Sequence, residues 1–310
     1  MSTNFSQQIV ALAEELGFDA CGIAKAVFLE EDAEKVEKWL DEGCQGEMDY
    51  LKSNKEKRYD PRLLNEGTKT IVSVIYNYFP QQFPSAEDNY KIAKYAYGDD
   101  YHEVMKQKLR QLLGKIESLT GKLESTRIFV DSAPVLERAW AVRCGLGFIG
   151  KNTCLIHPKK GSFFFIGQLL LPVEMEPVGK IIPNHCGRCT RCLDACPTGA
   201  LKAPFQLDAR KCISYLTIEY KGDLNQTEPH GFNDWIYGCD ICQNVCPYNR
   251  FSLPHCEDRF YPSEKFTAMR KTDWQNLTES QFQELFGKSA VKRAGFEGLK
   301  RNIECQRSED

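Results

Sequence analysis

This sequence of 310 residues lacks the segments that would send a protein into or across a membrane. Met1 to Gly17 has an amphipathic helical pattern without a basic start, an apolar run or a small-residue cleavage site, so it is no signal peptide. The longest apolar run, Phe163 to Val173, is too short to span a bilayer and contains a glycine and a proline. We therefore expect a cytoplasmic protein that makes no use of a membrane.

The chain also lacks a strong charge of either sign. Forty basic and 43 acidic residues give a net charge of −3, which favours solubility but names no partner. Repeats and low-complexity tracts are missing, apart from two similar cysteine motifs. A hydrophobic content of 42% allows a sizeable core, and the length suggests one large domain with a smaller one. This net charge does not exclude nucleic acid as a partner, because a local basic patch matters more for binding than the total charge of the chain.

What the sequence has in plenty is cysteine, with fourteen residues in a chain that shows no leader. This points to a reducing compartment and to metal ligation. The run from Cys186 to Pro197 has the bacterial ferredoxin spacing C-x2-C-x2-C-x3-C-P, in which the fourth cysteine ligates a second cluster. A second run ends at Pro247. We predict two [4Fe-4S] clusters, one held by Cys186, Cys189, Cys192 and Cys246, the other by Cys196, Cys212, Cys239 and Cys242.

Zinc and disulfides are the simpler uses of closely spaced cysteines. Zinc knuckles use C-x2-C pairs, but a third cysteine after two more residues and a fourth before proline is not their pattern. Disulfides between cysteines three apart would be strained, and the compartment is expected to be reducing. Two adjacent clusters make a path for electrons, so the remaining question is what lies at its end.

Hydrophobic periodicity predicts a mixed domain of helices and strands ahead of the cysteines. Helices are expected at 5–17, 28–43, 95–119 and 133–144. Strands are expected at 19–24, 70–79 and 126–130, with a hairpin of 154–157 and 162–171. A linker over 174–184 leads to the cysteine runs, and the segment 254–310 after them has a helical and polar pattern.

Asp131 lies at the predicted junction of the 126–130 strand and the 133–144 helix. The carboxyl end of a strand is a usual place for chemistry in an α/β sheet. With Pro134 in the first helical turn, a helix cap that stabilises by about 1 kcal/mol is an equal alternative. The local sequence leaves both interpretations open.

Two further stretches suggest contact with a ligand. Pro61 fixes a turn between Arg58 and Arg62, and such a turn can present a guanidinium to an anion. Three glycines with a lysine and an asparagine between Gly145 and Thr153 suggest backbone wrapped closely around a ligand. This stretch is no dinucleotide fingerprint, because it follows a predicted helix rather than a strand.

Asp100-Tyr-His102 is part of the Asp-x-His-x-x-Gly signature that supplies a histidine to the cobalt of cobalamin. Met105 stands where that glycine should be. We therefore predict that no histidine ligates cobalt at this position.

Together these stretches resemble the epoxyqueuosine reductase family, the cobalamin-dependent iron–sulfur enzymes of queuosine synthesis. The resemblance covers nearly the whole chain and is carried by 58–62, 100–102, 130–138, 145–153, 212–219 and 237–247. It implies an α+β fold with a nitroreductase-like cobalamin-binding domain (1–178), a two-cluster ferredoxin-like domain (179–255) and a short, basic helical tail (256–310). Many members continue into helical repeats that help to hold tRNA, whereas this chain stops at Asp310, so we expect a short form.

The resemblance implies reduction of the epoxide of epoxyqueuosine at the tRNA wobble position to queuosine, the last step of that synthesis. A flavodoxin- or ferredoxin-type donor would feed two clusters and cobalamin in a monomeric enzyme. Asp131 matches the general acid of the family, and a carboxyl group buried beside an apolar corrin would stay protonated near neutrality. The residues implied to contact cobalamin are Arg58, Asp131, Lys151, Asn152, Thr153, Ser214 and Asp240. In place of the repeats, the basic residues expected to bind tRNA are Lys292, Arg293, Lys300 and Arg301.

Three other functions compete with this one. A dehalogenase-like cobalamin enzyme would share the chemistry but usually carries an export leader. A flavin-dependent iron–sulfur reductase would fit the nitroreductase-like domain. A simple electron carrier would not need the long α/β segment that precedes the cysteines.

Overall fold

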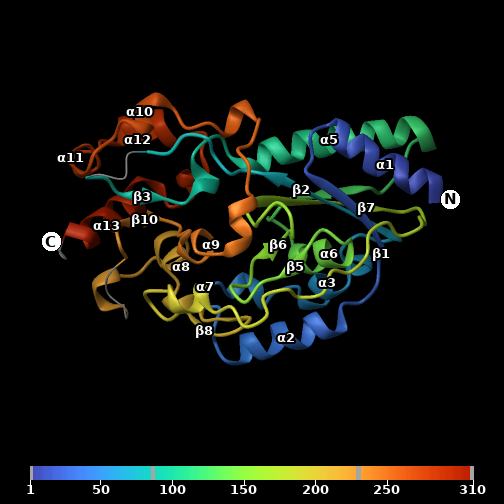
Figure 1. The fold of residues 1–310 in the computed structure, drawn as a ribbon, viewed down its shortest axis with the longest axis horizontal. Helices are drawn as coiled ribbons and strands as arrows, with labels where there is room; N and C mark the ends of the chain where they lie inside the picture. Colours follow the sequence, from blue (N-terminus) through green and yellow to red (C-terminus); the bar gives the residue numbers. More distant parts are fainter. Residues whose placement is uncertain (1–2, 85–87, 228–231, 308–310) are drawn as a thin grey trace.

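A four-stranded antiparallel sheet forms the centre of the N-terminal half of the chain (Figure 1). The structure is a computed structural model that describes residues 3–84, 88–227 and 232–307. The strand order is β1-β2-β7-β4, and each neighbouring pair runs antiparallel. Its strands are β1 (Ala20–Lys25), β2 (Thr70–Asn77), β7 (Phe164–Leu171) and the short edge strand β4 (Arg127–Phe129). The strands predicted at 19–24, 70–79 and 126–130 are thus confirmed within a residue or two.

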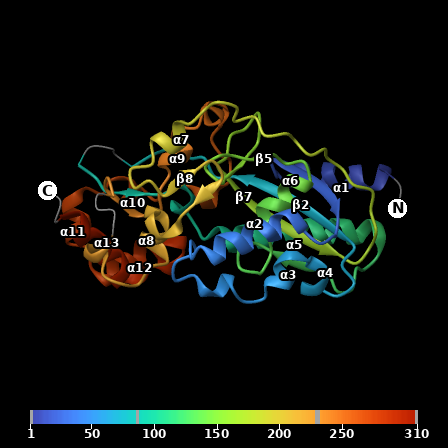
Figure 2. The same cartoon turned by 90° about the horizontal axis from the view of Figure 1, so that it is seen from below.

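Helices cover both faces of this sheet, which explains why β2 is an unbroken run of Val, Ile and other buried residues. On one face α1 (Thr3–Glu15) and α5 (Tyr101–Thr120) pack against Val72, Val74 and Leu169 (Figures 1 and 2). On the other face lie α6 (Glu137–Arg143) and the segment of Leu29, against Ile71, Ile75 and Leu170. Alternate residues of one strand therefore serve two separate cores.

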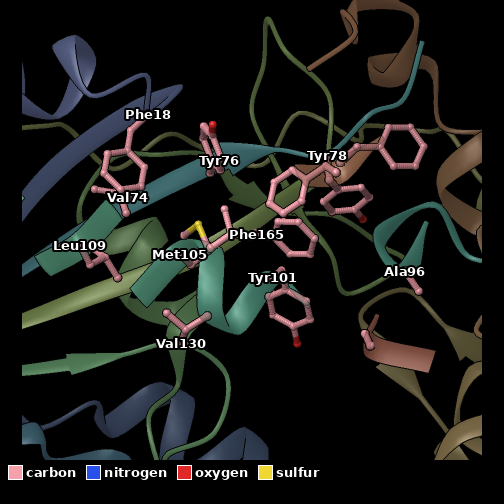
Figure 3. Packing of buried hydrophobic residues seen from close by; sticks show 14 of the residues in the cluster. Phe18, Val74, Tyr76, Tyr78, Ala96, Tyr101, Met105, Leu109, Val130 and Phe165 are labelled. Carbon is pink, nitrogen blue, oxygen red and sulfur yellow. The ribbon is translucent and has the colours of Figure 1, made fainter. Parts of the chain in front are cut away.

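Gly167 of β7 decides how closely α5 approaches the sheet. A Cβ at this position would lie 2.8 Å from Leu109 Cδ1 and 2.9 Å from Met105 Cε, which is too close for unshifted packing. Figure 3 shows Met105, Leu109, Val74 and Phe165 filling this contact, with Tyr101 at the beginning of α5. The close approach fixes the position of Tyr101 and of the residues beside it.

The remaining elements are short and belong mainly to the cysteine runs and the C-terminal part. The other strands are β3 (Lys91–Ile92), β5 (Phe148–Ile149), β6 (Leu155–Ile156), β8 (Leu201–Ala203), β9 (Gln206–Leu207) and β10 (Trp235–Tyr237). The other α-helices are α2 (Glu30–Asp41), α3 (Lys55–Tyr59), α4 (Pro61–Leu64), α7 (Arg191–Asp194), α8 (Ile213–Ile218), α9 (Ile241–Asn244), α10 (Glu264–Thr267), α11 (Lys271–Gln275), α12 (Glu279–Phe286) and α13 (Gly295–Arg307). None of the helices in the described ranges combines the length and hydropathy that crossing a bilayer needs.

The segment 256–310, which we predicted as a helical tail, is built into the body of the protein as far as it is described. Phe260, Phe266, Trp274 and Ile303 belong to the same buried cluster as the sheet residues of the first domain. The side-chain amide of Asn302 donates to Ile236 O at 2.8 Å, which ties α13 to β10. The helices α1 and α13 lie at opposite ends of the molecule, with the C-terminal helices gathered at one end (Figure 1).

Three predicted elements differ from the structure. The helix predicted over 95–119 begins at Tyr101, after a short 3-10 helix over Lys94–Ala96. The helix predicted over 133–144 begins only at Glu137, after a turn in which Asp131 has a φ of +57°. The hairpin predicted from 154–157 and 162–171 is correct at its turn, but its two strands do not pair with each other. His157 and Gly161 form a bridge, but β6 pairs with β5 whereas β7 joins the central sheet.

Candidate functional site

Asp131 lies in the loop between β4 and α6, and its side chain is 54% exposed. Asp131 is no helix cap, because α6 begins six residues later and its N-cap residue is Leu136. The α/β-sheet rule does not apply either, since β4 is the edge of an antiparallel sheet. The burial that we expected for its carboxyl group is not provided by the described residues alone. Its exposed position instead leaves room for a bound group to cover it.

The carboxyl group of Asp131 faces two groups from distant parts of the chain. The phenol of Tyr101 donates a hydrogen bond of 2.5 Å to Asp131 Oδ2. Arg293 Nη1 lies 3.7 Å from the same oxygen. Burial, and then the charge of Asp131, raise the pKa of Tyr101 well above its ordinary value, so the phenol keeps its proton. This brings together a carboxyl group, a phenol and a cation at one exposed position.

His102 supports this arrangement from beneath. Its Nδ1 lies 2.8 Å from Asp100 Oδ1, and Arg293 Nη2 lies 2.5 Å from Nδ1 and 2.8 Å from Nε2. The Nε2 atom also lies 3.6 Å from Asp131 Oδ2. Burial opposes ionisation of Asp100, but hydrogen bonds from His102 and Lys292 outweigh it and hold the pKa of Asp100 well below its usual range. Both nitrogens of His102 are thus engaged within the protein.

The position of Tyr101 follows from the beginning of α5. Asp100 caps the helix by accepting a hydrogen bond from the backbone N–H of His102 at 3.1 Å. The ring of Tyr101 stacks on Phe165 of β7, with centroids 4.3 Å apart and planes 2° from parallel. Because β7 belongs to the central sheet, the ring of Tyr101 rests on that sheet.

Arg58 is the clearest sign of a missing ligand in the described residues. It is 8% exposed, its Nη2 donates to Tyr50 O at 3.3 Å, and its buried Nε has no hydrogen-bond partner among them. Arg62, the other guanidinium of the predicted turn, pairs with Asp60 at 2.6 Å. Burial raises the pKa of Tyr50, and the charges of Asp131 and Arg58 also act on its phenol. The backbone of Tyr50 therefore holds Arg58.

We predicted that the glycines of the 145–153 stretch let the backbone wrap around a ligand. The structure shows the chain's own backbone beside Gly145 and Gly147 instead. A Cβ on Gly145 would lie 2.7 Å from Lys180 N, and one on Gly147 would lie 2.4 Å from Ile156 O. The space beside these glycines is thus filled by the protein's own backbone. Lys151 Nζ donates to Gly187 O at 2.7 Å, so the stretch instead holds one of the cysteine loops in place.

Other residues predicted to contact cobalamin also have partners within the chain. The buried Asn152 donates to Cys242 O at 3.4 Å, and Thr153 O accepts from Arg138 Nη1 at 2.6 Å. Asp240 is 2% exposed and accepts from the backbone N–H of Lys94 at 2.9 Å and from its Nζ at 3.3 Å. Ser214 lies on α8, two residues after Cys212. Asp240 is thus paired with Lys94 within the chain.

The structure brings the two cysteine runs together. A cavity of about 250 Å³ is lined by Cys186, Cys189, Cys192 and Cys246, although the last comes from the second run. Burial raises the pKa of the Cys239 thiol to about 12, and the nearby thiols of Cys212 and Cys196 act in the same direction. None of the fourteen cysteines, all of which lie in the described ranges, forms a disulfide.

A further thiol lies beside the second set, which the motif spacing did not indicate. Cys154 shares a hydrogen bond with Cys242, and this bond lowers the pKa of the Cys154 thiol. Cys154 follows the 145–153 stretch directly. Only the chain path around that stretch brings it to the cysteine loops.

The four basic residues predicted to bind tRNA have different surroundings. Arg293 belongs to the Asp131 site. Lys292 is 46% exposed and lies 3.1 Å from Asp100 Oδ2, and Lys300 is exposed on α13. Arg301 donates to the carbonyl oxygens of Tyr220, Gly222 and Leu216. Its guanidinium is therefore used to hold the fold, and we remove it from the candidate tRNA surface.

Glu137 is a site residue that the sequence reasoning missed. Its Oε1 accepts a hydrogen bond of 2.7 Å from the backbone N–H of Asp131, and its own carbonyl accepts from the buried Gln168 of β7 at 3.0 Å. Burial, and then the charge of Asp131, raise the pKa of Glu137 to about 8. An acidic residue in the first turn of a helix is ordinary, so its sequence position gave no signal of this role.

Comparisons with known proteins agree with these features. A family profile described as "4Fe-4S double cluster binding domain" matches residues 185–249. A second, described as "Epoxyqueuosine reductase QueG, DUF1730", matches residues 58–132. The first profile covers both cysteine runs, and the second contains Arg58, the 100–102 stretch and Asp131.

Individual relatives match over nearly the full chain. An epoxyqueuosine reductase of Cellulophaga algicola is 48% identical over 299 residues, which are 96% of this chain and 97% of that protein. A solved epoxyqueuosine reductase from Streptococcus thermophilus has a TM-score of 0.86 and 34% identity, covering 98% of this chain and 80% of that one. A third relative was solved with an epoxyqueuosine-modified tRNA-Tyr stem loop, with a TM-score of 0.85, 30% identity and coverage of 97% and 80%.

Proposed function

This chain belongs to the epoxyqueuosine reductase family, and from that premise we propose that it reduces the epoxide of epoxyqueuosine in tRNA to the alkene of queuosine. The observation that carries the proposal is the hydrogen bond between the buried Tyr101 and the exposed Asp131, and the unpartnered, buried Nε of Arg58 supports it. The relative solved with an epoxyqueuosine-modified stem loop supports the substrate. The reaction consumes two electrons and two protons and releases water.

We propose that the cysteines hold two [4Fe-4S] clusters in the sets named above. The double-cluster profile and the shared cavity of Cys186, Cys189, Cys192 and Cys246 support this. The donor set is chemically suited, because thiolates are the usual ligands of such clusters. Lys151 and Asn152 would stabilise the sites by holding the carbonyl groups of Gly187, Cys189 and Cys242.

Cobalamin fits the residues around Asp131 better than those around Asp240. The unpartnered, buried Nε of Arg58 could donate to a polar group of the cofactor, and Ser214 and Thr153 lie on segments next to the cysteine loops. Asp240, Lys151 and Asn152 are engaged elsewhere. When bound, cobalamin would supply a strongly reducing cobalt centre for opening the epoxide.

The residues of this chain would handle the protons. Opening of an epoxide leaves an oxyanion, and a positioned acid that protonates it accelerates the reaction. Asp131 is exposed toward a bound substrate, Tyr101 orients its carboxyl group, and the cation of Arg293 lies near enough to stabilise negative charge. The bonding of His102 to Asp100 and Arg293 keeps that cation in place.

A direct test uses protein reconstituted anaerobically with iron, sulfide and cobalamin. We expect conversion of epoxyqueuosine to queuosine in tRNA under a chemical reductant, detected by mass spectrometry of tRNA nucleosides. Protein without cobalamin should show no conversion. Conversion without cobalamin, or an absorption spectrum without bound cobalamin after reconstitution, would contradict the proposed cofactor.

Glu137 offers a test of how Asp131 is positioned. Glu137→Ala removes the acceptor of the Asp131 N–H, so we expect turnover to fall about tenfold with KM little changed, as for loss of one positioning hydrogen bond. Glu137→Gln keeps an acceptor oxygen and should restore most of the activity. Hydrogen exchange at the Asp131 amide should be faster in the alanine variant only.

The pH dependence of this loop follows from the raised pKa of Glu137. As the pH rises through about 8, the Glu137 carboxyl loses its proton beside the charge of Asp131. Repulsion should then loosen the loop in the wild type but not in Glu137→Gln. Equal amide exchange in all three proteins on both sides of pH 8 would show that Glu137 does not hold the loop.

The candidate tRNA surface is now Lys292 and Lys300. Replacing both with alanine should weaken tRNA binding several-fold at low salt and reduce its salt dependence, because each lost phosphate contact lowers the slope by about one. Lys122→Ala, at a lysine 77% exposed on another surface, is the matched control. Unchanged affinity of the double variant would exclude this surface from tRNA binding.

A further inference from the structure

A groove at the surface runs beside one of the two cysteine sets. Its volume is about 980 Å³, and Cys246 and Pro247 form part of its wall. We call it the Cys246 groove and define it by Phe79, Phe83, Lys94, Phe163, Arg191 and Arg250. Arg191 and Arg250 also border the cavity of Cys186, Cys189, Cys192 and Cys246. The groove and that cysteine set therefore share a wall.

This cysteine set is the one that a partner could approach. The cavity of Cys186, Cys189, Cys192 and Cys246 is bordered by the exposed residues His185, Arg250 and Phe251. The other set lies among buried residues, since Asn152 is 4% and Asp240 2% exposed beside Cys242 and Cys239. Electrons from outside would thus enter through the first set.

The groove is positively charged although the whole chain has a net charge of −3. Arg191 and Arg250 are exposed, and neither forms an ion pair with any residue in the described ranges. Lys94 pairs with the buried Asp240. Asp194 is an acidic lining residue, and it accepts a hydrogen bond of 2.7 Å from Thr190. Two unpaired guanidiniums thus dominate the charge of the groove.

Apolar side chains accompany these charges. Phe83 in the groove is 49% exposed, and Phe251, which borders the adjoining cavity of the four cysteines, is 41% exposed. The guanidinium of Arg250 lies 4.6 Å from the ring centroid of Phe251. Arginine and aromatic residues in a partly apolar surface are the composition of protein–protein contact sites.

We propose that the Cys246 groove docks an acidic one-electron carrier protein, which reduces the cluster held by Cys186, Cys189, Cys192 and Cys246. This inference rests on the proposed function, since that reaction needs two electrons which the chain itself does not contain. In each encounter the reduced carrier loses one electron and the cluster gains one, with no bond formed or broken. Two such transfers supply one turnover.

Charge complementarity favours a carrier over RNA at this groove. The residues that define it are not among those around Asp131, where the tRNA base would have to bind. A protein with acidic surface around its redox centre matches the two guanidiniums and the apolar rings together. Opposite charges would also steer the encounter, which makes association faster at low salt.

The test measures binding of an acidic flavodoxin, in its oxidised form, to the protein with reconstituted clusters. Arg191→Glu and Arg250→Glu should each raise Kd about tenfold, and the double variant should lose the salt dependence seen in the wild type. Arg110→Glu, at an exposed arginine of α5, is the matched control and should bind normally. Stopped-flow reduction by the reduced flavodoxin should slow in the same order.

Iron content is measured for every variant, so that a lost cluster is not mistaken for a lost contact. The neutral variants Arg191→Gln and Arg250→Gln serve if charge reversal prevents cluster assembly. Unchanged flavodoxin binding in the double variant would overturn the proposal, and so would loss of tRNA binding with flavodoxin binding intact. If the docking result holds while no epoxyqueuosine is converted, the proposed function fails and the docking surface stands.

Discussion

Exchange of Asp131 for asparagine is expected to lower the conversion of epoxyqueuosine-modified tRNA by about a hundredfold or more, as for loss of a general acid. Asparagine has the same size, tolerates the left-handed backbone at a φ of +57°, and can still accept the hydrogen bond of Tyr101. It cannot deliver a proton to the oxyanion. The fold, the clusters and cobalamin binding should therefore survive while turnover is lost.

The matched control is Asp234→Asn, because Asp234 also has a left-handed backbone, with a φ of +67°, but lies in the loop before β10. Both variants are compared with the wild type under a chemical reductant. Near-normal conversion by the Asp131 variant would mean that another group supplies the proton. Tyr101 is then the next candidate for the proton donor, because its phenol donates a hydrogen bond to Oδ2 of Asp131.

Replacing either Cys186 or Cys246 with alanine is expected to destroy the same cluster. Reconstituted wild-type protein should hold about eight irons, and each variant about four. The two residues lie in different cysteine runs, yet they line one cavity, so one missing thiolate should release the whole cluster. The matched control is Cys256→Ala, because that thiol is exposed and belongs to neither set.

Electron paramagnetic resonance of the reduced variants decides the ligand sets. Cys186→Ala and Cys246→Ala should leave the same remaining signal, and Cys239→Ala should leave the other one. If the remaining signal of Cys246→Ala differs from that of Cys186→Ala, or equals that of Cys239→Ala, the division of the eight ligands is wrong.

Features that depend on neighbours in sequence could be predicted well. The run of Val and Ile in β2 predicts a buried strand because side chains alternate between two covered faces. The cysteine spacing predicts the iron–sulfur domain, and the family profile for a double cluster confirms that prediction at the level of the domain. The prediction of the α6 boundary failed because the hydrophobic pattern does not show that residues 133–136 lie outside the helix, which begins at Glu137.

Features that depend on distant neighbours could not be predicted. The packing of the C-terminal helices on the central sheet places Arg293, a predicted tRNA residue, beside Asp131, and this contact could not be read from the sequence. The pairing of Asp240 with Lys94 could not be read from it either. The glycines near Gly145 were expected around a ligand but make room for the chain's own backbone. In each case the residue type suggested a role, but the sequence did not show which groups would surround the residue.

The sequence by itself therefore determined the composition of the site: a candidate acid at Asp131, seven cysteines in two runs with Cys212 between them, and an arginine at position 58. The tertiary structure decided which of these groups meet. Periodicity and motif spacing report interactions within a few residues, because helix and strand geometry repeats over that range. Contacts such as Tyr101 with Asp131, or Glu137 with the Asp131 N–H, arise only where the close packing of α5 on β7 and the turn after β4 bring side chains together.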